Sequence, residues 1–65
     1  MFNALNYSSS TFVKYRDRMF QWRWRLIAKN GKIIADSAEG YRNEADCDRG
    51  IALVKDSHRS RILRR

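Results

Sequence analysis

An alternation of tryptophan and arginine, Trp22-Arg23-Trp24-Arg25, is the feature of this 65-residue chain that could carry chemistry. Guanidinium groups neutralise phosphates and indole rings stack on nucleobases, so the pattern is compatible with a nucleic-acid surface. The same large aromatic rings also build protein cores. Because Trp24 shares its side of the alternation with Leu26, we expect Trp24 to pack in the core and Trp22 to pack in the core or in a subunit contact.

Catalysis has weak support in the sequence. Cys47 is the only cysteine and His58 the only histidine, so a thiolate–imidazole pair is the one nucleophilic combination available. A thiol on the apolar stripe of a helix is more often inert packing, and a structural zinc site needs four ligands. We therefore predict that the protein is not an enzyme and has no catalytic residues, no metal site and no cofactor.

Gly40, directly before Tyr41, could let a ligand approach the backbone. A turn that requires a positive φ explains a glycine more simply, because glycine adopts that conformation without a Cβ clash. We therefore expect a turn at Gly40, and we expect Tyr15 and Tyr41 to be packing residues.

The elements that position these side chains follow from residue types and periodicity. Thr11 to Arg16 is rich in β-branched and aromatic residues and predicts a first strand. After a turn at 17–19, a second strand is predicted from about Phe20 to Ala28. Asn30-Gly31 tolerates the positive φ of a two-residue type I′ loop, so a third strand should begin near Lys32 and pair antiparallel with the second.

Within the second strand, a period of two separates two faces. One face is large and apolar, and we expect it to lie against the core: Trp22, Trp24, Leu26 and Ala28. The opposite face carries the charge: Arg23, Arg25 and Ile27.

A helix is predicted from about Glu44 to Lys55. Asn43 can cap it, and acids in the first turn suit the positive end of the helix dipole. Gly50 should cost this helix about 1 kcal/mol relative to Ala, and a close approach of helix to sheet would compensate for that cost. The apolar stripe is formed by residues at helical spacing: Cys47, Ile51 and Val54. The last segment, from His58 to Leu63, is a candidate fourth strand.

The chain is short for an independent domain. A single domain of 65 residues buries a low fraction of its surface, and disulfides and zinc cannot add stability here, so we expect a homodimer. One cysteine and the lack of a secretory leader predict a cytoplasmic location. No apolar run approaches the roughly 20 residues of a membrane span, so no membrane partner is expected. Residues 1–10 are expected to form a flexible arm, and residues 11–65 a single domain.

The net charge of +7 is unevenly distributed. Residues 1–35 carry seven Lys or Arg against Asp17, residues 36–56 carry three basic and six acidic residues, and residues 57–65 carry four Arg and no acid. A basic sheet face left open by the helix would bind phosphates with a steep salt dependence, or would bind an acidic protein surface. The candidate binding face consists of Arg16, Arg23, Arg25, Arg59 and Arg61.

Motifs spread over roughly residues 11–56 follow one another in a set order: Arg23-Trp24-Arg25-Leu26, Asn30-Gly31-Lys32-Ile33-Ile34-Ala35-Asp36-Ser37, Glu39-Gly40-Tyr41, Gly50-Ile51 and Val54-Lys55. In that order and at those spacings they resemble the YegP-like domain of unknown function, a family of small proteins with single or tandem units. The resemblance implies an α+β fold, a β-β-β-α-β unit whose antiparallel sheet has one helix packed on one face. It also implies that two units complete a single sheet by exchanging their C-terminal strands, which for a single unit means a homodimer. It supplies no activity and no catalytic residue.

The chain departs from the family pattern at three places. Phe20 stands where members usually have Gly, and this bears on the shape of the first hairpin turn. Lys14 stands where they have an aliphatic residue, and this bears on which face of the first strand is buried. The tail from Arg59 to Arg65 is basic where relatives tend to be more acidic.

The leading hypothesis is a non-enzymatic homodimeric module that binds a macromolecule on its open, basic sheet face. Two alternatives stay open: a nucleic-acid-binding protein, and a small inhibitor or adaptor that binds another protein. Core or dimer contacts are assigned to Trp22, Trp24, Leu26, Ile51, Val54 and Ile62.

Overall fold

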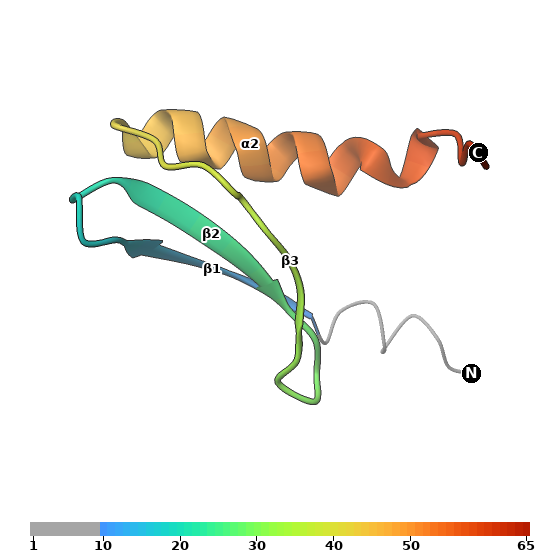
Figure 1. Ribbon diagram of the computed structural model, residues 1–65, viewed down its shortest axis with the longest axis horizontal. Helices are drawn as coiled ribbons and strands as arrows, with labels where there is room; N and C mark the ends of the chain where they lie inside the picture. Colours follow the sequence, from blue (N-terminus) through green and yellow to red (C-terminus); the bar gives the residue numbers. More distant parts are fainter. Residues whose placement is uncertain (1–9) are drawn as a thin grey trace.

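The fold is a three-stranded antiparallel sheet with one helix over one of its faces (Figure 1). The computed structural model describes residues 10–65, so the expected N-terminal arm lies outside the described residues except for Ser10. The elements are the strands β1 (Thr11–Arg16), β2 (Trp22–Ile27) and β3 (Ile33–Asp36), the helix α2 (Glu44–Asp56) and a 3-10 helix η1 (Ser57–Arg59). The sheet order β1-β2-β3 confirms the predicted α+β class with three antiparallel strands and one helix.

Backbone pairing defines which side chains share a face. Lys14 lies opposite Trp24, and Tyr15 lies opposite Arg23. Trp24 approaches α2 at Gly50, so Lys14 shares the face that the helix covers. Tyr15 and Arg23 therefore lie on the face that the helix leaves open, because successive side chains of a strand point to opposite sides.

The turn between β2 and β3 differs from the prediction. The Gly31 N–H donates to the Ala28 carbonyl (2.9 Å), and the Ala28 N–H donates to the Lys32 carbonyl (2.8 Å). Gly31 has a φ of +87°, whereas Asn30 is not among the residues with positive φ. The predicted two-residue type I′ loop is therefore wrong, and the loop has three residues with a left-handed third residue. The Asn30 side chain accepts the Lys32 N–H (3.0 Å) instead, a local bond that holds it in this turn.

The turn between β1 and β2 repeats this hydrogen-bond pattern with a different residue type. The Phe20 N–H donates to the Asp17 carbonyl (3.0 Å), and the Asp17 N–H donates to the Gln21 carbonyl (2.9 Å). Phe20 has a φ of +61°, so it occupies the position that Gly31 fills in the other hairpin. A left-handed conformation costs an L-residue roughly 1–2 kcal/mol. Phe20 stores this strain with 77% of its surface exposed.

The core is small and centres on Trp24. Among residues 10–65, Trp24 (5% exposed) and Cys47 (0%) are the buried apolar side chains, and Phe12 packs edge-on against Trp24 with ring centroids 5.6 Å apart. A Cβ on Gly50 would lie 2.9 Å from the Tyr41 hydroxyl oxygen and 3.4 Å from the Trp24 indole nitrogen. The predicted close approach of helix to sheet at Gly50 is confirmed.

Gly40 is required for space and not for its φ. Its φ does not lie in the left-handed region; in this connection the positive φ falls on Ala38, at +65°. A Cβ on Gly40 would lie 2.8 Å from the Gln21 Cβ. The expectation of a positive-φ turn at Gly40 is therefore wrong, and the backbone approaches the side chain of the first hairpin instead.

Helix α2 begins at the predicted residue but without the predicted cap. Asn43 has an extended backbone at the N-cap position, and its side chain makes no capping hydrogen bond. Its carbonyl accepts the Asp46 N–H (3.1 Å) and the Cys47 N–H (3.3 Å). The first turn of α2 is therefore closed by backbone bonds alone at this position.

The expected fourth strand from His58 to Leu63 does not form within the described chain. Residues 57–59 form η1, and residues 60–65 have no regular secondary structure. This tail continues past the end of α2, away from the sheet (Figure 1). Ile62 is 98% exposed and Leu63 72%, so the tail holds apolar side chains that its own copy does not cover.

Replacing Phe20 with glycine should raise the free energy of unfolding by about 1 kcal/mol, because glycine adopts the left-handed conformation without a Cβ clash. Phe20→Ala is the matched control, since it removes the same exposed ring but keeps the Cβ. Urea unfolding at one fixed protein concentration measures both. An equal gain for the alanine variant would show that backbone strain is not the cause.

Replacing Gly50 with alanine should lower the free energy of unfolding by about 1–3 kcal/mol, because the added methyl group overpacks the helix–sheet contact. This loss should appear although alanine favours helix by about 1 kcal/mol. Adding Tyr41→Phe to Gly50→Ala removes the nearest atom and should recover part of the loss in the same unfolding measurement. A net gain in stability for Gly50→Ala would contradict the contact.

Candidate functional site

The face of the sheet that α2 leaves open is a mixed aromatic and basic surface. Arg25 lies over the Tyr15 ring, with its guanidinium carbon 4.6 Å from the ring centroid. This geometry is a cation–π contact, and it holds the guanidinium over the ring. We call this surface the open face; its residues on β1 and β2 are Thr11, Val13, Tyr15, Arg23, Arg25 and Ile27.

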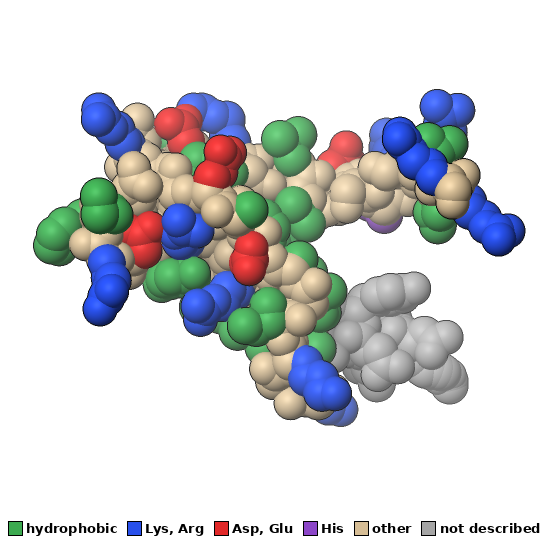
Figure 2. Space-filling model, viewed as in Figure 1, with side chains coloured by type: hydrophobic (Ala, Val, Ile, Leu, Met, Phe, Trp, Pro, Cys, Tyr) green, Lys and Arg blue, Asp and Glu red, His purple; other side chains and the backbone are tan. Residues whose placement is uncertain are grey.

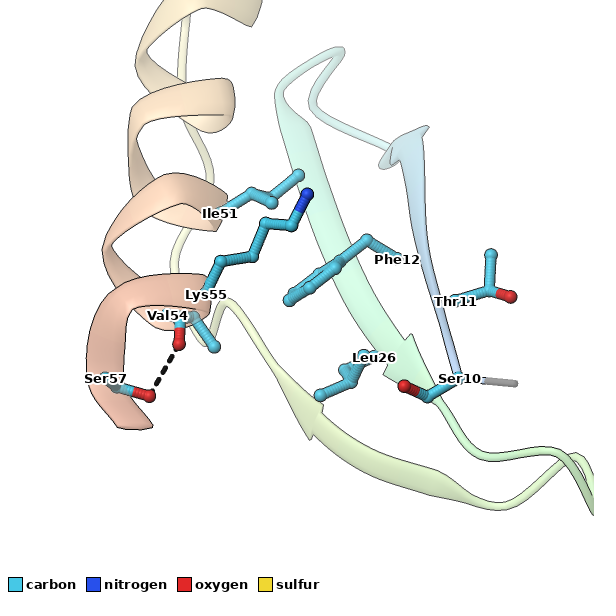
Figure 3. Close-up of a pocket in the computed structure, with 8 residues that line it drawn as sticks. All are labelled: Ser10, Thr11, Phe12, Leu26, Ile51, Val54, Lys55 and Ser57. Atoms are coloured by element: carbon cyan, nitrogen blue, oxygen red, sulfur yellow. Dashed lines mark hydrogen bonds between the residues drawn. The ribbon is translucent and has the colours of Figure 1, made fainter. Parts of the chain in front are cut away.

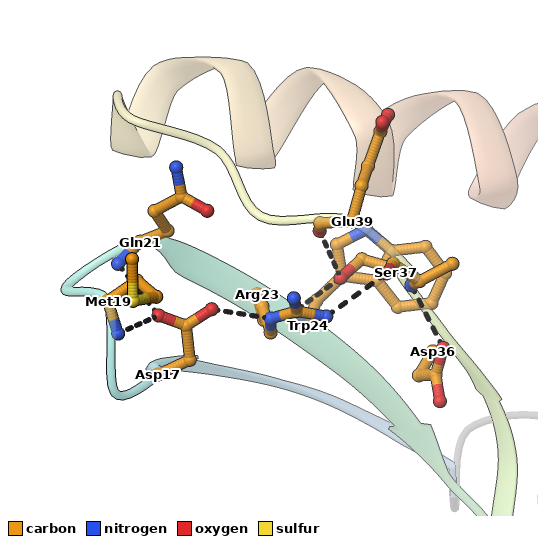
Figure 4. A network of polar contacts seen from close by, with 9 residues as sticks. Asp17, Met19, Gln21, Arg23, Trp24, Asp36, Ser37 and Glu39 are labelled. Carbon is orange, nitrogen blue, oxygen red and sulfur yellow. Dashed lines mark hydrogen bonds and ion pairs between the residues drawn. The ribbon is translucent and has the colours of Figure 1, made fainter.

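Arg23 on the open face is tied into the fold (Figure 4). Its Nε donates to the Asp17 carboxylate (2.6 Å) and its Nη1 donates to the Ala38 carbonyl (3.1 Å). The same carboxylate accepts the N–H groups of Met19 (2.8 Å) and Gln21 (3.0 Å). Arg23 therefore links the first hairpin turn to the connection between β3 and α2, and its first task is structural.

The charges around Arg23 shift the titration of both partners. Hydrogen bonding to the Arg23 guanidinium, followed by the Gln21 and Met19 backbone N–H groups, holds the pKa of Asp17 below its ordinary value. Hydrogen bonding to Asp17 raises the pKa of Arg23. Arg25 in turn lies directly opposite Asp36 across the β2–β3 pair. Among the described residues Arg25 forms no ion pair, so of the two open-face arginines Arg23 is the one paired with a carboxylate.

The other arginines of the expected binding face lie elsewhere. Arg16 is on the helix-covered side of β1, with its guanidinium carbon 4.9 Å above the Trp22 ring. It still borders a depression of about 490 Å³ at the β1–β2 turn, which is lined by Tyr15, Arg16, Asp17, Arg18, Met19, Arg23 and Arg25. Arg59 belongs to η1 and Arg61 to the tail, beyond the end of α2 (Figure 1). A single copy therefore does not gather the five predicted arginines on one face.

An apolar groove of about 610 Å³ separates the C-terminal half of α2 from the strands. Figure 3 shows side chains from the helix and from both strands pointing into it. It exists because α2 contacts the sheet closely at Gly50 and diverges from it farther along (Figure 1). The lining residues are Ser10, Thr11, Phe12, Leu26, Ile51, Val54, Lys55 and Ser57.

The predicted core or dimer residues divide between the core and this groove. Trp24 is buried and Trp22 is half-buried, paired through its backbone with Tyr41. Leu26, Ile51 and Val54 are half-buried and line the groove. Ile62 is almost fully exposed on the tail.

Lys14 forms a contact that the sequence reasoning missed. Its ammonium donates to Glu44 and to Asp48, each at 2.7 Å, which fastens β1 to the first turns of α2. The Asp48 and Glu44 carboxylates raise the pKa of Lys14. Two acids spaced by four residues on the same helix face were the available signal. Lys14 on the helix-covered face thus replaces the family's aliphatic residue with an ionic contact.

Cys47 and His58 do not form a catalytic pair. Cys47 is fully buried, and burial raises the pKa of its thiol. His58 lies in η1, eleven residues farther along, which corresponds to roughly 16 Å of helix. Within residues 10–65 no group of three or more His, Cys, Asp or Glu side chains could hold a metal ion, and no helix is long and apolar enough to span a membrane.

Comparisons with known proteins give a consistent result. A family model described as "Domain of unknown function (DUF1508)" matches residues 17–59. A UPF0339 protein of Methanosarcina acetivorans is 46% identical over 48 residues, which are 74% of this chain and 81% of that protein. A UPF0339 protein of Neisseria meningitidis serogroup B is 41% identical over 44 residues, 68% of this chain and 77% of that protein.

The fold has a counterpart among solved structures. The NMR solution structure of a protein from Haloferax volcanii matches with a TM-score of 0.78 and 33% sequence identity. The match covers 88% of this chain and 97% of that one. Together with the family model, it confirms the resemblance to a small domain of unknown function that the sequence motifs indicated.

Asp17→Asn should make the free energy of unfolding less dependent on pH in the acid range. Because the pKa of Asp17 is lower in the folded state, its contribution is complete above the ordinary carboxyl pKa of about 4 and is lost as the pH falls below it. The free energy of unfolding of the wild type should therefore drop more steeply than that of the variant from about pH 5 to about pH 2. Asp56→Asn is the control, since Asp56 is exposed and has no ion pair among the described residues. Equal slopes for the wild type and Asp17→Asn would contradict the Arg23 bridge.

Proposed function

Since this chain belongs to the DUF1508 family of domains of unknown function, we propose its role from its own surfaces: it is a non-enzymatic homodimeric module that binds another macromolecule across the open face of its sheet. The observation that carries the proposal is a groove with apolar side chains from the helix and the sheet, together with two tail side chains, Ile62 and Leu63, that the same copy leaves exposed. Each surface is complementary to the other, and a second copy supplies both.

The groove and the tail support exchange between two copies. Phe12, Leu26 and Ile51 line the groove without being fully buried, and Ile62 and Leu63 are exposed on the tail. Covering such side chains contributes roughly 1.5–3 kcal/mol each when burial is complete. A tail from a second copy that directs Ile62 into the groove would remove this side chain and the apolar lining of the groove from water at once.

The sheet edge beside the groove supports the same arrangement. β1 is an edge strand in the order β1-β2-β3, and its first residues, Thr11 and Phe12, line the groove. An edge strand presents unpaired N–H and C=O groups that can pair with another chain. Residues 60–65 of a second copy, placed along β1, would form the fourth strand that each copy lacks and would join the two copies into one sheet.

The open face supports a macromolecular partner better than a small ligand. Small-molecule sites are concave and enclose most of the ligand, whereas the open face is one side of a sheet with the Tyr15–Arg25 pair on it. A broad partner can contact this surface without entering a cavity.

A second candidate, a protein-binding inhibitor or adaptor, is favoured by the β1–β2 turn. Met19 and Phe20 are each 77% exposed at its tip, and Arg18 stands next to them. An aromatic anchor with an arginine rim is typical of residues that dominate protein interfaces. In this candidate the turn, and not the open face, contacts the partner.

Ile62→Asp should convert a dimer into a monomer, because a charge in place of the apolar side chain cannot enter the groove without a large desolvation cost. Light scattering on a sizing column at tens of micromolar measures the mass, and the wild type should have twice the 7.8 kDa of one chain. Leu53→Asp is the matched control, since Leu53 is 75% exposed and does not line the groove; it should remain dimeric. A monomeric wild type would refute the exchange.

A further inference from the structure

We propose that the exchanged tail completes an anion-binding surface: Arg61 and Arg65 of one copy join Arg25 of the other on the open face and form a composite site for the phosphate backbone of nucleic acid. The inference rests on the tail exchange proposed above. It explains how a face that is electrically balanced in one copy becomes basic, and it gives the tail a task beyond closing the sheet.

A single copy holds little uncompensated charge on its open face. Arg23 is paired with Asp17 at 2.6 Å, and Arg25 lies opposite Asp36 in the strand register. The formal charges of two guanidinium groups and two carboxylates therefore cancel on this side of the sheet, although Arg25 itself forms no ion pair among the described residues. Additional basic groups must reach this face before it attracts a polyanion. The tail can supply them, because residues 57–65 contain four Arg and no acid.

The alternation of the tail decides which arginines reach the open face. In a strand formed by residues 60–65, Ile62 and Arg64 share one side, and Arg61, Leu63 and Arg65 share the other. With Ile62 directed into the groove, Arg61 and Arg65 point to the open face. The preferred register places one arginine, Arg64, on the groove side, at the end of the strand. The opposite register would place two, Arg61 and Arg65, beside Lys55 of the groove, where desolvation and like charge oppose them.

The neighbours of these arginines favour nucleic acid over an acidic protein. The Arg25 guanidinium lies over the Tyr15 ring and forms no ion pair among the described residues, so its N–H groups can donate to phosphate oxygens. Proteins that bind single-stranded nucleic acid combine basic side chains along the phosphate backbone with aromatic rings that stack on bases. Arginines and a tyrosine ring on one sheet face provide both kinds of group. On β1 and β2 the exposed large apolar side chain of the open face is Val13, at 40%, whereas Met19 and Phe20, each at 77%, lie in the β1–β2 turn.

The first arm of the test uses the full chain and a fluorescent single-stranded oligothymidine over a salt series. Arg61→Glu with Arg65→Glu should weaken binding at least tenfold and should reduce the salt slope by about 1.4, at roughly 0.7 per phosphate contact on a single strand. Arg64→Glu is the matched control: it makes the same kind of charge change in the same tail, on the groove side, and should change affinity less than threefold. Sizing of each variant establishes that it is still a dimer.

The second arm tests whether the site is shared between copies. Arg25→Glu removes the basic group that the sheet of a copy provides. Arg61→Glu with Arg65→Glu removes the basic groups that its tail provides. When the two variants are mixed and allowed to exchange subunits, each heterodimer should regain one intact face, so the mixture should bind the oligonucleotide more tightly than either variant alone. If both groups came from the same copy, mixing would restore nothing, and the composite site would be refuted.

The outcomes separate this inference from the proposed function. A dimeric wild type that does not retain the oligonucleotide refutes the nucleic-acid site and leaves the dimer standing. A monomeric wild type refutes the exchange and the composite site together. Equal losses for Arg64→Glu and for Arg61→Glu with Arg65→Glu refute the alternation. Binding to polyglutamate with the same dependence on Arg61 and Arg65, in place of binding to the oligonucleotide, refutes the class of partner.

Discussion

The contact between Gly50 on α2 and the Trp24–Tyr41 pair on the sheet governs the rest of the molecule. It brings the helix so close to the sheet that no Cβ fits at position 50, and it buries Trp24 and Cys47, the two buried apolar side chains of residues 10–65. A straight helix held tightly near its middle by a twisted sheet must diverge from the strands farther along. The apolar groove beside the second half of α2 is the result of that divergence.

Two basic side chains of the sheet, Lys14 and Arg23, connect it to other segments. Lys14 binds two carboxylates on α2, and Arg23 binds a carboxylate in the first turn and a carbonyl in the β3–α2 connection. Exposed ion pairs contribute little stability individually, but these two join segments that are distant in sequence. Among the described residues, Lys14, Arg23 and Arg49 are the basic residues in ion pairs, so most of the fourteen Lys and Arg have no carboxylate partner. Four of these are in residues 57–65, and basic side chains gather at that end of the molecule (Figure 2).

The strands and the helix were predictable from local signals: residue types for β1, alternation for β2, the Asn30-Gly31 turn for the start of β3, and helical spacing for α2. The alternation in β2 separated Trp24 from Arg23 and Arg25, and the helical spacing placed Cys47 and Ile51 on the stripe that faces the sheet. The two turn predictions that were wrong depend on backbone geometry and on tertiary contacts. Asn30-Gly31 is compatible with two loop types, and only the pairing distinguishes them. Gly40 is required by a side chain of the first hairpin, which no local pattern reveals.

The candidate site was harder to predict, because its residues depend on positions relative to other segments. Arg23 and Arg25 were placed on the open face from alternation alone. Arg16 was assigned to the same face, but it directly follows Tyr15 in β1, so its side chain points to the other face, where it lies over Trp22. Arg59 and Arg61 lie on a tail whose position in one copy is set by the end of α2. Under the proposed exchange, the surroundings of Arg59 and Arg61 come from a second copy, and a local sequence pattern does not predict such a contact.

The reactivity of the Cys47 thiol can report how often helix α2 separates from the sheet. With no exposed surface, the sulfur is out of reach of alkylating reagents while the helix rests on Trp24. Reaction requires the helix to lift, so the labelling rate counts excursions from the native state when reclosing is fast. Since the chain has one cysteine, every modified molecule records the same event, and the docking of α2 can be followed without introducing a foreign label.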